Sequence, residues 1–392
     1  MQYLKRSRIL KGLRSYQRDL RLDLFRGLAL LCIFVDHTPG DRLTDFTVRN
    51  LGFSDASELF VFISAYSAGM VYSSRAARDG LWAVAHRVWR RAAQIYLAHI
   101  VLLVTAALLA AQLTRVMGDP QFVQGMNIGP LLEQPGPTFL QALALLFQPT
   151  FMNILPLYIV LLAAFPLILW LIRRNAGMAL GVSVLVWIAC QEWPGLDNPY
   201  GTTWQFNPLA WQLLFVIGAS LGSVASEGGS AIPRNRVLLA AAAAYAVAAF
   251  VIGARAWSYD GSSVALPPVL HVLLFPVMDR ADLSLWRLAD LLALAYVATY
   301  FLRAESAVLQ WRVSRMVILC GQHSLTLFCV GVLLSIAGWA AFVEFGGRLA
   351  VQVAVNLAGF AIMVGIAWLL SRRSHTPVIP RAITPTAVSS SV

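Results

Sequence analysis

An arginine and a histidine in the first apolar segment have the types and the spacing to bind an anion and to accept a proton. Arg26 and His37 are separated by ten residues. On an α-helix, eleven steps of about 100° place both side chains on one face, roughly 16 Å apart along the axis. Arginine binds anions through a fixed fork of N–H donors, and histidine suits general-base chemistry near neutral pH. The alternative is structural: Arg26 reaches lipid phosphate, and His37 ends the helix before Pro39.

Two carboxylates are candidates to orient the imidazole of His37. Asp36 directly precedes it, although helical geometry turns Asp36 away from the Arg26–His37 face. Glu58 begins the next apolar segment, and the short loop 41–54 makes the two segments neighbours. Because Asp55 and Glu58 also fit a capping arrangement at a helix N-terminus, both the catalytic and the structural interpretation of Glu58 stay open.

A basic cluster lies at the inner ends of the second and third apolar segments. It contains Arg75, Arg87, Arg90 and Arg91, of which the last three share one helix face at i, i+3 and i+4. Such a face could hold a pyrophosphate or a 3′-phosphate through forked hydrogen bonds. The simpler explanation is the excess of positive charge on cytoplasmic loops. No glycine-rich nucleotide-binding motif accompanies the cluster.

His323 lies within the apolar segment 316–338, in the sequence Gly321-Gln322-His323-Ser324. It is a candidate substrate-binding residue, although a structural hydrogen bond is the interpretation that we favour. The four cysteines all fall inside apolar runs without the spacing of a zinc site or a disulfide framework, so we expect no metal.

The composition defines the elements that must position these side chains. Only 12% of the 392 residues are charged and 58% are hydrophobic, whereas about 25% of a soluble domain is charged. The net charge of +11 is spread between apolar runs and lacks any nucleic-acid-binding motif, so we exclude nucleic acid as a partner. The sequence predicts an all-α polytopic membrane protein with about ten transmembrane helices. The expected spans are 24–40, 56–74, 92–113, 152–172, 177–193, 207–226, 236–254, 286–302, 316–338 and 349–370.

Most Lys and Arg residues fall on one side of these spans, which predicts that both termini are cytoplasmic. We expect a basic cytoplasmic segment at 1–23, a membrane domain at 24–370 and a disordered cytoplasmic tail at 371–392. The first apolar run is interpreted as a retained helix and not as a removed signal peptide. The Pro-rich segment 264–278 is either re-entrant or an ordered loop.

The sequence resembles the OpgC family, succinyltransferases that act on osmoregulated periplasmic glucans, over about residues 18–370. The resemblance rests on LDLFRG (22–27), DHTPG (36–40), NLGFSDASELFVF (50–62), LPLY (155–158), NPLAWQLLF (207–215) and GQHSL (321–325). Ser64-Ala65 departs from the usual Ser-Gly of the family. The chain is also similar to the wider group of transmembrane acyltransferase family 3 enzymes, whose first-helix R-x10-H signature Arg26 and His37 reproduce.

The resemblance implies a transmembrane acyltransferase-like bundle in a bacterial inner membrane, with His37 as catalytic base and Arg26 as a donor-site or pore residue. It implies a cytoplasmic acyl-CoA, with succinyl-CoA expected, as co-substrate without a permanently bound cofactor, and a periplasmic glucan hydroxyl as acceptor. Two alternatives remain: a membrane transporter of an anionic solute, and an acyltransferase acting on another cell-envelope glycan or on lipid.

Overall fold

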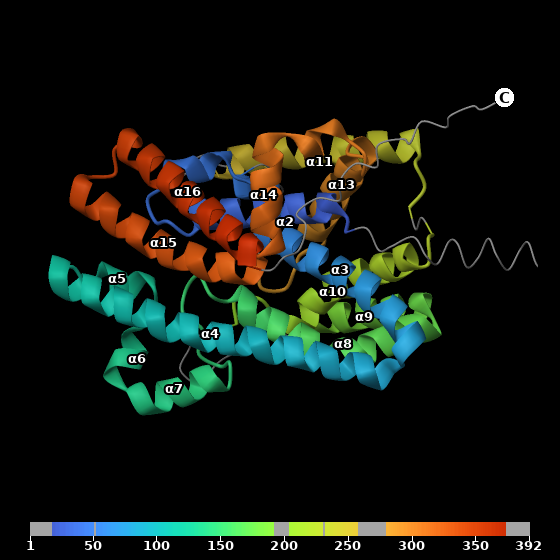
Figure 1. Ribbon diagram of the computed structural model, residues 1–392, viewed down its shortest axis with the longest axis horizontal. Helices are drawn as coiled ribbons and strands as arrows, with labels where there is room; N and C mark the ends of the chain where they lie inside the picture. Colours follow the sequence, from blue (N-terminus) through green and yellow to red (C-terminus); the bar gives the residue numbers. More distant parts are fainter. Residues whose placement is uncertain (1–17, 51, 192–203, 230–231, 258–279, 374–392) are drawn as a thin grey trace, which may run out of the picture.

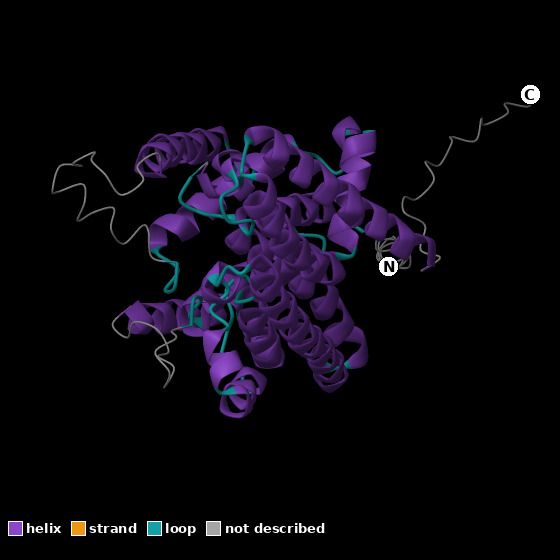
Figure 2. Ribbon diagram, turned by 90° about the vertical axis from the view of Figure 1, so that its left-hand side faces the viewer, coloured by secondary structure: helices purple, strands orange, loops and turns teal. Residues whose placement is uncertain are grey.

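The regular secondary structure of the described residues is helical (Figures 1 and 2). The computed structural model describes residues 18–50, 52–191, 204–229, 232–257 and 280–373. The main helices are α2 (Leu20–Asp36), α3 (Ala56–Asp79), α4 (Leu81–Met117), α8 (Ile154–Arg174), α9 (Ala176–Gln191), α10 (Pro208–Ser226), α11 (Arg236–Trp257), α13 (Leu285–Phe301), α14 (Arg312–Gln322), α15 (Ser324–Phe345) and α16 (Leu349–Arg373). Shorter elements are η1 (Arg42–Phe46), η2 (Val48–Asn50), α5 (Gln121–Gly125), α6 (Gly129–Glu133), α7 (Pro135–Leu143) and η3 (Ala307–Gln310).

Six of the described helices are long and apolar enough to cross a membrane, so the chain is a helical membrane protein. They are α4, α8, α10, α11, α15 and α16. Each of the ten expected spans overlaps at least one helix, but ten crossings are not confirmed. Helices α2 and α13 have 17 residues each and α9 has 16, which is short for a bilayer core.

Three expected boundaries need correction. The expected span 316–338 is two helices, because His323 leaves helical geometry (φ −113°, ψ 35°) between α14 and α15. This break lets α14 pack on α2 and α16 while α15 also reaches α4. The first helix ends at Asp36, so His37 is its C-cap, and α16 continues through Arg373 into the expected tail. Segment 264–278 and residues 1–17 and 374–392 lie outside the described part of the chain.

Helix α2 contacts α3, α14 and α15, and two glycines let its backbone approach that of α14 (Figure 1). A Cβ added to Gly27 would lie 2.0 Å from the carbonyl oxygen of Val317, and one added to Gly321 would lie 1.9 Å from that of Asp23. The two backbones can touch only because neither glycine carries a side chain. This contact fixes the helix that bears Arg26 and His37.

Candidate active site

Two cavities lie among α2, α3, α8 and α15, and each of these four helices contributes residues to both. The His37 cavity has a volume of about 230 Å³ and the Arg26 cavity one of about 280 Å³. Phe328 of α15, which is only 2% exposed, lines both cavities. The His37 cavity is lined by Ile33, Asp36, His37, Arg49, Asp55, Ala56, Ser57, Thr150, Phe151, Asn153, Ile154, Gln205, Phe206, Arg280 and Phe328. Arg26 and His37 therefore line two different cavities, and the ring of Phe328 lies between these cavities.

His37 closes the C-terminal end of α2 and presents its ring to the first chamber. Its backbone N–H donates to the carbonyl oxygen of Ile33 at 2.9 Å, so the last helical turn holds the residue. The ring centroid lies 4.9 Å from that of Phe151, with the two planes tilted by 36°. Nδ1 is buried and has no hydrogen-bond partner among the described residues. The imidazole is therefore placed by the backbone and by ring packing, and Nδ1 carries no bond that would compete with a substrate.

Neither expected carboxylate orients the imidazole through Nδ1. Asp36 lines the His37 cavity, although an ideal helix would point its side chain away from the face of Arg26 and His37. Its carboxylate accepts hydrogen bonds from the hydroxyl groups of Thr47 at 2.7 Å and Thr44 at 3.2 Å. Glu58 is fully buried, and its carboxylate is occupied by Arg287 at 2.5 Å and by the backbone N–H of Asp55 at 2.9 Å. Of the two interpretations of Glu58 that the sequence left open, these contacts favour the structural one, because the charged partner of Glu58 is Arg287.

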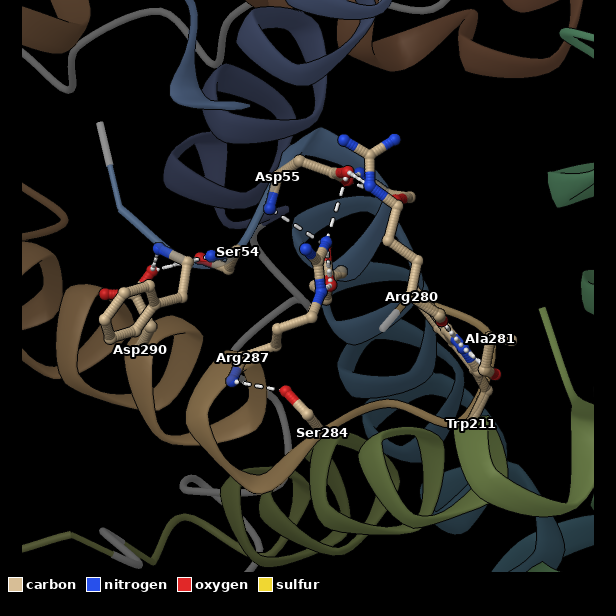
Figure 3. A network of polar contacts seen from close by, with 11 residues as sticks. Ser54, Asp55, Trp211, Arg280, Ala281, Ser284, Arg287 and Asp290 are labelled. Carbon is tan, nitrogen blue, oxygen red and sulfur yellow. Dashed lines mark hydrogen bonds and ion pairs between the residues drawn. The ribbon is translucent and has the colours of Figure 1, made fainter. Parts of the chain in front are cut away.

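A buried ionic network holds the start of α3 against α13 (Figure 3). Arg287, which is 2% exposed, binds Glu58 and also lies 3.2 Å from the Asp55 carboxylate, while Nε of Arg280 lies 3.6 Å from the same carboxylate. Burial alone would raise the pKa of Asp55, but the charges of Arg287 and Arg280 hold this pKa well below its usual range. One wall of the His37 cavity is thus a fixed, ionised cluster.

Asp290 of α13 provides a second link to the same loop. Its carboxylate accepts from the backbone N–H groups of Phe53 and Ser54 at 3.1 and 2.9 Å, and from the Ser54 hydroxyl at 2.6 Å (Figure 3). Asp55 and Glu58 also form the capping box that the sequence predicted. The entry to α3 is consequently held from both sides, which fixes one wall of the chamber.

The Arg26 cavity has a different chemistry. Arg26 donates to Ser67 at 2.9 Å and to Asp23 at 3.3 Å, and its side chain is 12% exposed. Arg91 of α4 lines the same chamber, as do the polar side chains of Tyr158 and Gln322. Two guanidinium groups from different helices therefore face one space, which is an arrangement suited to an anion.

The remaining basic residues of the expected cluster do not line either cavity. Arg87 pairs with Asp79, Arg90 is exposed, and the guanidinium of Arg75 lies 5.9 Å from the ring centroid of Tyr72. Arg87, Arg90 and Arg91 are all exposed, but only Arg91, whose guanidinium also donates to Gln94 at 3.3 Å, is among the residues that line the Arg26 cavity.

His323 makes the structural contact that the sequence favoured. Its Nε2 lies 2.9 Å from the hydroxyl of Ser371, which links the α14–α15 break to α16. Its neighbours Gln322 and Ser324 line the Arg26 cavity, whereas His323 does not. In the part of the chain that the structure describes, no group of three or more His, Cys, Asp or Glu side chains could hold a metal ion.

Several residues that line the His37 cavity could not be predicted from the sequence, among them Arg49, Arg280, Asn153 and Phe328. A buried asparagine at the start of a strongly apolar helix was the one local signal available. The other three depend on how distant segments meet.

A protein-family model described as "OpgC protein" matches residues 18–375. The match spans every residue of both cavities and all the main helices. No curated protein and no solved structure gives a significant match.

Proposed function

The chain belongs to the OpgC family, whose membership indicates a membrane-associated glucan-modifying acyltransferase, and on that premise we propose a specific reaction. An acyl group passes from a coenzyme A thioester, anchored at the Arg26 cavity, to a hydroxyl group of a glucan that enters the His37 cavity. His37 is the general base.

The observation that carries this proposal is the pair of adjoining cavities. One offers two guanidinium groups, Arg26 and Arg91, and the other offers a buried imidazole nitrogen without a partner. A donor with a charged end and a long uncharged arm needs such an arrangement, because its phosphates and its reactive carbon are far apart. Arg75, Arg87 and Arg90 are exposed and lie on α3 and α4, the helices that also contribute to the Arg26 cavity, and such basic residues favour the approach of a polyanion.

In the reaction that we propose, His37 accepts the proton of the glucan hydroxyl as the oxygen attacks the thioester carbonyl carbon. A new C–O bond forms and the carbonyl oxygen carries the negative charge. The intermediate collapses with cleavage of the C–S bond, and the imidazolium returns the proton to the departing thiolate. The products are an O-acylated glucan and free coenzyme A. The thioester must pass Phe328 to reach His37.

Succinyl is the acyl group that we propose. Arg49 and Arg280 line the His37 cavity, and their N–H groups can pair with the free carboxylate of a succinyl chain. We further propose that the protein lies in a bacterial inner membrane with the Arg26 cavity toward the cytoplasm, both termini cytoplasmic and the His37 cavity toward the periplasm. The side on which most basic residues lie supports this orientation.

The test is His37→Ala, with His323→Ala as the matched histidine control outside both cavities. Periplasmic glucans from cells that produce each variant are analysed by mass spectrometry, and the purified proteins are assayed with labelled succinyl-CoA and glucan. We expect His37→Ala to lose transfer by about 10²- to 10⁴-fold, the usual contribution of a general base, at an unchanged protein level. His323→Ala should keep it. Normal acylation by His37→Ala would reject the mechanism, and a changed solute distribution with unaltered esters would support transport instead.

A further inference from the structure

Asn153, at the start of α8, is a buried polar side chain without a bonding role in the fold. It is 8% exposed and lines the His37 cavity, and its Oδ1 is buried without a hydrogen-bond partner among the described residues. Asparagine is favoured at helix N-termini because its side chain caps the first N–H groups. Here Asn153 makes no capping bond.

Another asparagine at the start of an apolar helix caps it as expected. Oδ1 of Asn207, which precedes α10, accepts from the backbone N–H of Leu209 at 3.0 Å, and its Nδ2 donates to Asp282 at 2.8 Å. Burying an amide without such bonds costs about 1–3 kcal/mol, which a fold normally avoids. At Asn153 the orphaned atom, Oδ1, is an acceptor and calls for a donor such as a substrate hydroxyl group. No described residue accepts from the N–H groups of Nδ2, so these remain available to an acceptor on the same ligand.

The surroundings of Asn153 indicate what that ligand carries. Phe151, two residues earlier, packs against the His37 ring in a left-handed conformation (φ 73°) that is rare for an aromatic residue. Ile154, the first residue of α8, lines the same cavity. The backbone N–H of a first helical residue has no acceptor within its own helix. The N-terminal end of a 21-residue helix, which carries partial positive charge, therefore adjoins the catalytic histidine. Negative charge that develops next to His37 is stabilised there.

We propose that the side-chain amide of Asn153, supported by the N-terminus of α8, binds the carbonyl oxygen of the thioester and stabilises the oxyanion of acyl transfer. This assignment rests on the proposed function. As the glucan oxygen bonds to the carbonyl carbon and His37 takes the hydroxyl proton, an Asn153 N–H donates to the oxygen that gains the charge. When the C–S bond breaks, the carbonyl re-forms and the thiolate takes the proton from His37. Asn153 itself exchanges no proton.

The experiment compares Asn153→Ala and Asn153→Asp with wild type, all purified in detergent and assayed with labelled succinyl-CoA and glucan. Removing one oxyanion donor should lower kcat by about 10²- to 10³-fold. Asn153→Asp should be at least as slow, because a carboxylate repels the developing charge. Acyl-CoA affinity and the thermal unfolding midpoint should stay at their wild-type values, since the amide makes no capping bond in the fold. Asn175→Ala is the matched control: Asn175 bonds the backbone N–H of Met178 at 3.1 Å on an exposed surface, and its kcat should not change.

The outcomes separate the two proposals. Full kcat in Asn153→Ala or Asn153→Asp, with His37→Ala inactive, would overturn the assignment of Asn153 and leave the acyltransferase proposal in place. A lowered unfolding midpoint or weakened acyl-CoA binding that accounts for the lost rate would also overturn it, because the role would then be structural. Absence of acyl transfer by the wild-type protein would reject the proposed function itself.

Discussion

The two cavities on either side of Phe328 are built from the same four helices, yet they are held in place differently. The His37 cavity is walled by a buried ionic network whose arginine, Arg287, is 2% exposed. The Arg26 cavity is bounded by an arginine that bonds Ser67 and Asp23 and keeps 12% of its side chain exposed. The Arg287–Glu58 pair beside the first cavity is almost fully buried, whereas Arg26 in the second keeps weaker and partly exposed contacts.

This difference matches the demands that acyl transfer makes on each region. A reacting centre needs its groups fixed before the substrate arrives, because reorganisation during the reaction raises the barrier. A binding site for a charged donor needs arginines that can leave weak internal partners for stronger ones. The comparison predicts that substitutions in the ionic network beside the His37 cavity act on folding, and that substitutions of the arginines in the Arg26 cavity act on affinity.

The largest effect is expected from Arg287→Met. It removes the guanidinium that pairs with Glu58 and Asp55, so the fully buried Glu58 loses its charged partner, and breaking a buried ion pair typically costs about 3–5 kcal/mol. The thermal unfolding midpoint in detergent and the yield of folded protein measure this loss. The added change Glu58→Gln should recover part of it.

Arg26→Gln is the corresponding change in the other chamber, and it should leave the unfolding midpoint close to that of wild type. Asp23 keeps its contact with Arg18 at 2.5 Å, so no buried carboxylate is abandoned. Equal destabilisation by Arg287→Met and Arg26→Gln would erase the distinction between the chambers.

A smaller effect is expected on donor binding. Arg26→Gln and Arg91→Gln should each weaken acyl-CoA binding by about tenfold, or roughly 1.4 kcal/mol, because each removes a charged donor from the Arg26 cavity. Equilibrium binding of labelled succinyl-CoA gives the dissociation constants.

Arg87→Gln and Arg90→Gln provide the comparison, because both residues are exposed and neither lines a cavity. If these two variants bind labelled succinyl-CoA as tightly as wild type does, the anion site lies inside the Arg26 cavity. Loss of affinity only in these variants would move the site to the surface.

An effect of the same size, on the rate of transfer and not on binding, is expected from enlarging the side chain between the two cavities. Phe328→Trp adds volume where the two chambers adjoin, and it should slow transfer by about tenfold, or roughly 1.4 kcal/mol of barrier, while acyl-CoA binding persists. Single-turnover assays separate the two quantities. Phe342→Trp tests for general strain on α15, since Phe342 is also buried but lines neither cavity. Equal slowing in both variants would mean that packing, and not passage, limits the rate.

Local periodicity explains what the sequence could predict. The helical character of the chain, the capping box at Asp55 and Glu58, and the placement of Arg26 on α2 with His37 near its C-terminal end all follow from residues within a few turns of one another. The break at His323 did not follow, because the segment contains no proline and the kink is fixed by contacts with α2 and Ser371.

Tertiary contacts explain the part of the site that was not predicted. Glu58 and Arg287 are 229 residues apart in the chain, and Phe328 becomes a partition only when α15 packs beside α2 and α8. Asn153 carries a signal in the sequence, an amide ahead of an apolar run, but only the structure shows that it does not cap its helix. Whether a buried polar side chain finds a hydrogen-bond or ion-pair partner is decided by how the helices pack together.

The glycine contacts between α2 and α14 have a consequence for how material crosses this protein. With Gly27 against the Val317 carbonyl and Gly321 against that of Asp23, any rocking or sliding of α2 would separate or collide two main chains. A carrier that alternates between inward-open and outward-open shapes requires such movement, and this scaffold resists it. We therefore expect acyl transfer to take place without movement of α2 against α14. The flexible arm of the donor then carries the acyl group from one cavity to the other.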